Sequence, residues 1–252
     1  MLPEILLYIV IFLYGIVIGS FLNVIIYRVP NKENIATTRS HCMSCGYQLK
    51  WYDLLPLFSW LALGGKCRKC KAKISVQYPL IEGLNGVLYL VVFARCGWSI
   101  DSLLYCLLFS ALLALSVIDF RTYEIHPGFD YFILTLGLIR VVTDLHNWLE
   151  YAIGLVAVSA VLFVLYQLSK GAAIGGGDVT LMAATGLLLG WKRNLLAFVL
   201  GCILGSVIHL IRMKVSREGH VLAMGPYLSM GVAIAALWGN EMIEWYLGML
   251  GF

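Results

Sequence analysis

Two aspartates lie at the ends of apolar segments, where a carboxylate is energetically unfavourable. Asp119 closes the run LALSVID, and Asp178 opens another run in GGGDVTLMA. Acidic groups at the edge of a hydrocarbon layer are costly and usually functional. Two carboxylates within hydrogen-bonding range share a proton, so one can act as general base on a water and the other as general acid. The pair therefore predicts the chemistry of an aspartic protease.

The glycines before Asp178 suit this chemistry. Gly175 and Gly177 have no side chain, so they let the backbone approach a substrate strand or a neighbouring helix closely. The alternative is that Asp178 only caps a helix after a glycine loop, with Asp119 an interfacial residue near Arg121. The pairing of the two acids on one membrane face favours the catalytic interpretation.

Four cysteines between the first two apolar segments have the spacing of a metal site. They form two Cys-x-x-Cys pairs separated by 21 residues: Cys42, Cys45, Cys67 and Cys70. The two-residue gap lets both sulfurs of a turn face one ion, and four thiolates leave a tetrahedral zinc no open position for catalytic water. We therefore expect a structural zinc. Two disulfides are the alternative, which a reducing cytoplasm disfavours.

The composition places these residues in a bilayer. Of the 252 residues, 61% are hydrophobic and only 13% are charged, and the mean hydropathy is +0.87. A span needs roughly 20 mostly apolar residues. We expect an all-α polytopic membrane protein with about eight transmembrane helices, near 4–27, 79–95, 102–118, 127–143, 149–168, 179–191, 194–212 and 224–249. The first segment is expected to be a retained span, with a cleaved signal peptide as the alternative.

The basic residues predict the orientation. With eight spans, 14 of the 18 Lys and Arg fall on one face, in segments around 28–78, 119–126, 169–178 and 212–222. Because Lys and Arg collect on the cytoplasmic side, both aspartates and the cysteine loop are expected to face the cytoplasm, with both termini outside. This bias accounts for the net charge of +4 without a nucleic-acid partner. The predicted organisation is a first helix over 1–28, a cytoplasmic metal-binding loop over 29–78 and a seven-helix protease core over 79–252.

Several motifs, taken in order, resemble the type IV prepilin peptidases, membrane aspartic proteases with a GxGD motif. GSFLNV followed by RVP resembles the opening motif of the family, and the paired Cys-x-x-Cys loop resembles its zinc-binding insert. SVQYPLIE is similar to the segment that follows this insert. DFRTYEI resembles the motif around the first catalytic aspartate, Asp119, and GGGD around Asp178 matches the second.

The resemblance implies a substrate and a location. The substrate would be a prepilin or pseudopilin whose short basic leader is removed on the cytoplasmic side of the bacterial inner membrane. Many full-length members also methylate the new N-terminus with S-adenosylmethionine. The sequence gives no separate sign of a methyl-donor pocket, since no strand-borne glycine-rich nucleotide loop is visible. Methylation therefore stays an open expectation, and the sequence predicts no particular oligomeric state.

Two positions depart from the family pattern. Members commonly carry Lys where this chain has Thr180, which removes a cation near the two acids. Members also commonly carry Pro directly after the Ile of the first motif, whereas here His126 precedes Pro127. Two other classes remain as alternatives. A proton-coupled transporter would use intramembrane acids but shows no obvious inverted repeat, and a non-catalytic secretion-assembly component would tolerate the loss of either aspartate.

Overall fold

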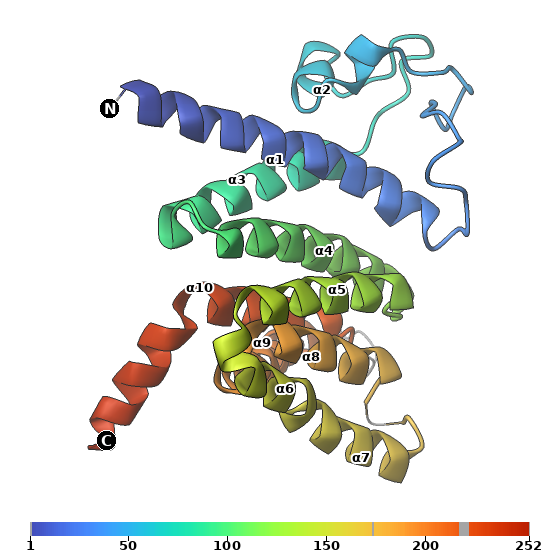
Figure 1. The fold of residues 1–252 in the computed structure, drawn as a ribbon. Coiled ribbons are helices and arrows are strands. Elements are labelled where there is room, and N and C mark those ends of the chain that lie inside the picture. The colour runs from blue at the N-terminus through green and yellow to red at the C-terminus, as the bar shows by residue number, and fades with distance from the viewer. Residues whose placement is uncertain (1, 173, 217–221, 252) are drawn as a thin grey trace. The chain divides into compact units, whose positions relative to one another are not determined.

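The protein folds into two compact helical units. The computed structural model describes residues 2–172, 174–216 and 222–251. One unit is Met1–Trp98 and the other is Ser99–Phe252. Within the described ranges the regular elements are helices (Figure 1). The cysteine loop also contains two isolated β-bridges. The all-α prediction is therefore confirmed.

Two long helices build the first unit, α1 (Leu2–Arg28) and α3 (Gln77–Cys96), with the short α2 (Phe58–Ala62) in the loop between them. They pack backbone to backbone. A Cβ at Gly15 would lie 2.7 Å from the Gly86 Cα, and a Cβ at Gly19 would lie 2.7 Å from the Glu82 Cα. This is the close approach that small residues four apart allow between membrane helices.

Buried amides fasten α1 to α3. Asn85 is fully buried and donates from Nδ2 to the Gly15 carbonyl at 2.7 Å. Asn23 donates to the Tyr78 carbonyl at 3.2 Å, and its Oδ1 accepts from Gln77 Nε2 at 3.2 Å. The opening motif GSFLNV thus holds the first helix against the segment SVQYPLIE, because unpaired amides would be costly at these buried positions.

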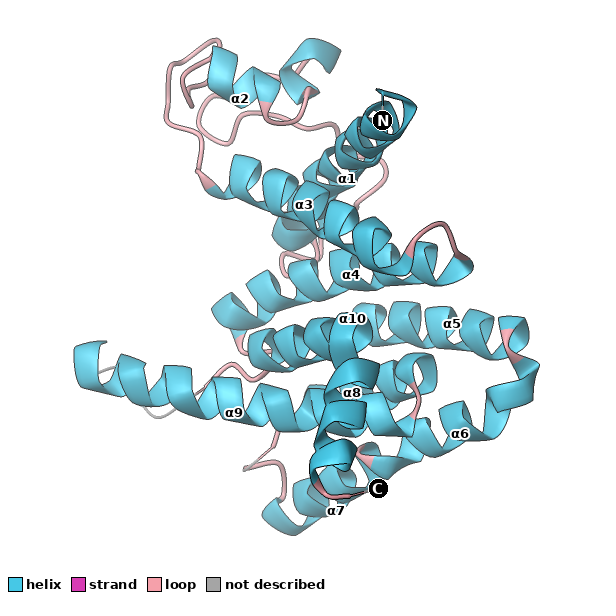
Figure 2. Ribbon diagram, turned by 90° about the vertical axis from the view of Figure 1, so that its left-hand side faces the viewer, coloured by secondary structure: helices cyan, strands magenta, loops and turns pink. Residues whose placement is uncertain are grey.

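The second unit contains seven helices in its described residues: α4 (Ile100–Thr122), α5 (Pro127–Thr143), α6 (Trp148–Ala157), α7 (Ser159–Ser169), α8 (Gly176–Leu189), α9 (Trp191–Ser216) and α10 (Gly225–Met249). Helix α8 lies at the centre, packed against α5, α6, α7 and α9 (Figure 2). Its Leu181, Met182 and Leu188 are fully buried. With 14 residues, α8 is only about 21 Å long, shorter than the roughly 30 Å core of a bilayer.

Five helical segments of the described chain are long and apolar enough to cross a membrane: Glu4–Arg28, Gln77–Cys96, Ile100–Thr122, Leu145–Ser169 and Trp191–Lys214. The protein is therefore a helical membrane protein. The further spans expected at 127–143, 179–191 and 224–249 coincide with α5, α8 and α10, so the count of eight stays a prediction. Residues 217–221 of the basic segment 212–222 lie outside the described residues.

The expected span 149–168 is divided into α6 and α7. The division falls at Val158, between Ala157 and Ser159. The Ser159 hydroxyl donates to the Leu155 carbonyl one turn earlier. A serine that bonds back to its own helix in this way often bends the helix, and the apolar pattern of the sequence carries no sign of this bend.

Candidate active site and metal site

Asp119 lies in the last turn of α4 and is almost completely buried. Only 4% of it is exposed. Its Oδ2 accepts a hydrogen bond from the backbone N–H of Gly225 at 2.9 Å, at the first residue of α10. A Cβ at Gly225 would lie 2.6 Å from the same oxygen. Glycine is therefore required at this helix start for the carboxylate to reach the backbone donor. Sequence reasoning missed Gly225, although a Gly-Pro pair opening an apolar segment marks a helix start.

Asp178 lies in the first turn of α8 and is half-buried. Both aspartates belong to the second unit, and they are near enough for the charge of Asp119 to act on Asp178. Helices α5 and α10 each pack against both α4 and α8. Among the described residues no hydrogen bond joins the two carboxyl groups directly. The structure thus brings the two predicted acids into one neighbourhood of the second unit, without a direct hydrogen bond between them.

The glycine turn before Asp178 is closely packed at two of its three positions. A Cβ at Gly177 would lie 2.6 Å from the Ile125 Cβ, and a Cβ at Gly175 would lie 3.2 Å from Asp178 Oδ2. At Gly176 the nearest atom, in Tyr166, would be 3.7 Å away, which is ordinary contact. The turn therefore rests against the segment that follows Asp119, and the close approach expected at Gly177 is made to Ile125.

A third carboxyl group, Asp130, belongs to the same unit and was missed from the sequence. It lies in the first turn of α5, and its Oδ2 accepts a hydrogen bond from the Thr180 hydroxyl at 2.6 Å. The signal that could have found it is an acid at the start of an apolar segment, the same signal that picks out Asp178. His126 has a capping position, since its Nδ1 accepts from the Gly128 N–H at 3.2 Å.

The four cysteines of the first unit converge. Their Sγ atoms all lie within 4.8 Å of one another, and the Sγ atoms of Cys42 and Cys70 are 3.8 Å apart. Ligands about 2.3 Å from a tetrahedral zinc would have sulfurs about 3.8 Å apart. The four cysteines of the cluster form no disulfide in the described structure. The cluster therefore fits a metal ion in both ligand type and spacing.

The two Cys-x-x-Cys pairs have the same local geometry, 25 residues apart. The N–H of Gly46 donates to the Cys42 carbonyl, and the N–H of Lys71 donates to the Cys67 carbonyl. Gly46 has φ +67° and Lys71 has φ +60°, so the residue that follows each pair has a left-handed backbone conformation. A β-bridge closes each turn, between His41 and Gln48 and between Lys66 and Lys73.

Backbone donors prepare one of these sulfurs for a cation. The N–H groups of Cys70 and Lys69 lower the pKa of the Cys67 thiol to about 6, because hydrogen bonds to a thiolate favour the charged form. Since the thiolate is the metal ligand, the turn presents Cys67 in its binding form near neutral pH. His41 bonds the Arg39 carbonyl through Nδ1 at 3.2 Å and is not among the clustered ligands.

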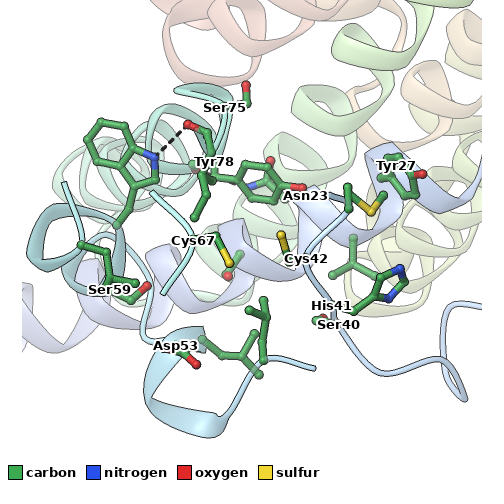
Figure 3. A pocket seen from close by; sticks show the side chains of 18 of the residues that line it. Asn23, Tyr27, Ser40, His41, Cys42, Asp53, Ser59, Cys67, Ser75 and Tyr78 are labelled. Atoms are coloured by element: carbon green, nitrogen blue, oxygen red, sulfur yellow. Dashed lines mark hydrogen bonds between the residues drawn. The ribbon is translucent and has the colours of Figure 1, made fainter. Parts of the chain in front are cut away.

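A pocket of about 370 Å³ lies beside the cysteine cluster within the first unit. Asn23 and Tyr27 of α1, Tyr78 of α3, and Cys42 and Cys67 of the loop line it (Figure 3). Glu82 also lines the pocket. It is buried, and its Oε2 accepts from the Leu57 N–H at 2.8 Å. Arg28 closes the pocket at the end of α1, where it donates to the carbonyls of Asn34 and Ile35.

Comparison with known proteins covers both units. Residues 13–96 match the bacterial peptidase A24 N-terminal domain, and residues 106–210 match the type IV leader peptidase family. The chain is 33% identical to a protein of Stutzerimonas stutzeri, over 92% of this chain and 91% of the relative. The chain belongs to the type IV prepilin peptidase family.

Further prepilin peptidases match nearly end to end. The relative from Pseudomonas putida is 32% identical over 94% of this chain and 93% of its own length. The relative from Pseudomonas aeruginosa is 30% identical over 95% of this chain and 93% of its own length. All three relatives are named prepilin leader peptidase/N-methyltransferase. No solved structure matches the chain significantly.

Proposed function

We propose that this membrane protein is an aspartic endopeptidase that removes the leader of prepilins or pseudopilins, with Asp119 and Asp178 as its catalytic residues. The observation that carries the proposal is that two acids on separate helices of one unit lie within electrostatic reach of each other, beside a glycine turn. The relatives are named for cleavage of the same substrate class.

The reaction needs one ionised and one protonated carboxyl group. The ionised carboxylate takes a proton from a water, whose oxygen attacks the carbonyl carbon of the scissile peptide bond. The protonated carboxyl gives its proton to the departing nitrogen, so the acids exchange states while the peptide bond is hydrolysed. Gly175 and Gly177 position Asp178, because the first lets the carboxylate lie against the turn and the second lets the turn pack on Ile125. Glycine at 225 lets a backbone N–H hold the Asp119 carboxylate.

The proposed setting is the bacterial inner membrane, with the acids and the cysteine loop in the cytoplasm. The support is the charge distribution, since a basic prepilin leader would stay on the side where Lys and Arg collect. We further propose the division into a first helix over 1–28, a loop over 29–78 and a protease core over 79–252. Cysteine labelling of intact cells with an impermeant reagent at residues 3 and 217 would test the orientation.

We also propose that Cys42, Cys45, Cys67 and Cys70 hold a structural zinc ion. The fit of the Sγ spacing to a tetrahedral site supports this assignment. When bound, the ion would cross-link the two turns of the loop and so contribute to its folding. The turns themselves supply the ligands and the backbone donors around them.

A second activity, methylation of the new N-terminus, is favoured by the pocket in the first unit. Its volume of about 370 Å³ lies in the range of small-molecule sites. Glu82 lines it, and a carboxylate suits a sulfonium donor or an ammonium acceptor, both of which are cations, whereas the Asp53 carboxylate is paired with Arg68 at 2.7 Å. S-adenosylmethionine would supply the methyl group. Ser59→Trp, which fills the pocket, should abolish binding of S-adenosylhomocysteine in calorimetry and leave peptide cleavage within about twofold.

Co-expression with candidate prepilins from the same genome tests both activities together. The mass of the mature pilin N-terminus reports cleavage and methylation in one spectrum. The proposal expects removal of the basic leader in the presence of the wild-type chain. If every candidate prepilin keeps its full mass while the protein is inserted and folded, the peptidase assignment is wrong.

A further inference from the structure

Asp130 is a third acid in the peptidase unit, and its surroundings differ from those of the other two. Only 8% of it is exposed. It lies on α5, which packs against both α4 and α8, the helices that carry Asp119 and Asp178. Among the residues that the structure describes, no Lys or Arg pairs with it, and its Oδ1 has no hydrogen-bond partner. A buried carboxylate without a cation is costly, so this acid needs an explanation.

The one partner of Asp130 leads directly to the glycine turn. The Thr180 hydroxyl lies 2.6 Å from Asp130 Oδ2. The same hydroxyl lies 3.0 Å from the Gly177 carbonyl and 3.3 Å from the Gly176 carbonyl. Asp130, Thr180 and Gly177 thus form a chain of hydrogen-bonding groups that ends one residue before Asp178.

A threonine hydroxyl has a single proton, so the protonation state of Asp130 decides where that proton points. If Asp130 is neutral, its O–H donates to Thr180 Oγ1, and the Thr180 proton is free to bond the Gly177 carbonyl. If Asp130 is ionised, Thr180 must donate to Asp130, and Gly177 loses this donor. The neutral acid leaves each of the three groups paired, whereas the ionised acid adds a buried charge.

We propose that Asp130 is a positioning residue of the peptidase: as a neutral carboxylic acid it holds the glycine turn, and hence Asp178, through the Thr180 hydroxyl. The inference rests on the proposed function and extends it to a residue outside the catalytic pair. Ionisation of Asp130 would release the turn and add a negative charge that acts on Asp178. Cleavage should therefore fall on the alkaline side of the pH profile.

Other titratable groups lie on the helices that surround the hydrogen-bonded groups of Asp130, Thr180 and Gly177. Asp178 lies on α8 and Asp119 on α4, and Cys202 of α9 is within electrostatic reach of Asp178. His126 caps the start of the helix of Asp130 itself. On α6, Tyr151 accepts a hydrogen bond from Arg140, which lies near the opposite end of α5 from Asp130. Asp119 and Asp178 are thus the groups whose titration must be separated from that of Asp130.

Substitutions that separate charge from hydrogen bonding test the proposal. Asp130→Asn is neutral and its amide can donate to Thr180, so it should keep cleavage within about twofold at the optimum and move the alkaline limb to higher pH. Asp130→Ala and Thr180→Val break the chain and should each lower kcat/KM roughly tenfold. Thr180→Ser should restore most activity. Thr135→Val, which removes a hydroxyl that bonds only the Tyr131 carbonyl on the exposed side of α5, is the control.

The outcomes distinguish this inference from the proposed function. If Asp130→Asn abolishes cleavage as completely as Asp178→Asn, Asp130 acts as an ionised carboxylate and the inference is wrong. Wild-type activity in both Asp130→Ala and Thr180→Val, or an alkaline limb that Asp130→Asn does not move, overturns it equally. Normal cleavage by Asp119→Asn or Asp178→Asn would instead refute the catalytic pair, whatever the Asp130 variants do. Should Asp130→Ala fail to fold, Asp130→Asn and Thr180→Val still decide.

Discussion

Alanine at the three consecutive glycines of the GGGD turn should have three different effects on cleavage. A Cβ at Gly177 would lie 2.6 Å from the Ile125 Cβ, a separation that real Cβ atoms essentially never show. A Cβ at Gly175 would lie 3.2 Å from Asp178 Oδ2, so the carboxylate must move by a few tenths of an ångström. A Cβ at Gly176 would meet nothing closer than 3.7 Å. None of the three has a positive φ, so space alone decides.

The magnitudes follow from these separations. Overpacking of this kind costs about 1–3 kcal/mol. If about 2 kcal/mol of that is lost from the transition state, Gly177→Ala lowers kcat/KM about 30-fold. Gly175→Ala displaces a reacting group by less than 1 Å and should lose roughly tenfold, since a misplacement of about 1 Å can cost about 100-fold. Gly176→Ala should stay within about twofold and should slightly stabilise the protein, because alanine restricts the unfolded chain.

The assay is cleavage of a purified prepilin by the purified variants in one detergent, with kcat/KM from initial rates. Ile125→Gly removes the atom that Gly177→Ala would strike, so the double variant should recover part of the loss. That recovery appears as a coupling between the two substitutions in a double-mutant cycle. Equal losses at all three glycines, or a larger loss at Gly176 than at Gly177, would refute the reasoning from close contact.

Four further predictions concern the metal loop and Thr180. Purified protein should contain about one zinc per chain by elemental analysis, and Cys→Ser changes at the cluster should reduce thermal stability more than kcat. Because backbone donors lower the pKa of the Cys67 thiol to about 6, the contribution of its thiolate to the stability of the metal-free loop is complete above the ordinary pKa of 9.0 and is lost as pH falls through about 6; thermal unfolding of the zinc-free protein as a function of pH checks this. Gly46→Ala should cost about 1 kcal/mol through its φ of +67° alone, since its Cβ meets no atom within 4 Å, whereas Lys71→Gly should stabilise the loop. Thr180→Lys should lower kcat/KM, because it removes the hydroxyl that bonds Asp130, and should move the acidic limb of the remaining activity downward, because an ammonium favours ionised carboxylates; an unmoved limb contradicts this.

The sequence indicated the residues that could carry the chemistry, but it did not indicate the residues that hold them in place. Asp119 and Asp178 were visible because an acid beside an apolar run is costly, and the cysteines because metal ligands recur at fixed spacing. Gly225 and the bond it donates to Asp119 depend on α10 meeting α4, more than 100 residues apart in the chain, which no local pattern encodes. Asp130 carried the same local signal as Asp178, and its burial and its contact with Thr180 became visible only in the structure.

The helices are confirmed, whereas the number of membrane spans stays a prediction. Each expected apolar segment lies on a helix, because hydropathy reports burial in lipid or protein alike. The length of a helix helps to tell burial in lipid from burial in protein. Helix α8, at 14 residues, is apolar because other helices surround it, and its Leu181 is fully buried. The interruption between α6 and α7 at Val158 adjoins a side-chain hydrogen bond of Ser159, which the apolar pattern cannot show.

The central claim is tested most directly by measuring how three variants cleave a prepilin: Asp119→Asn, Asp178→Asn and the double variant. The measurement is the ratio of mature to precursor pilin in cells that contain equal amounts of inserted protein. A neutral amide can neither accept a proton from water nor return one, so each single variant should leave only precursor. The double variant should be no worse than either single one, because loss of one partner already disables the pair. Mature pilin at the wild-type ratio with either single variant would contradict the catalytic pair and would leave Asp178 as the cap of a helix.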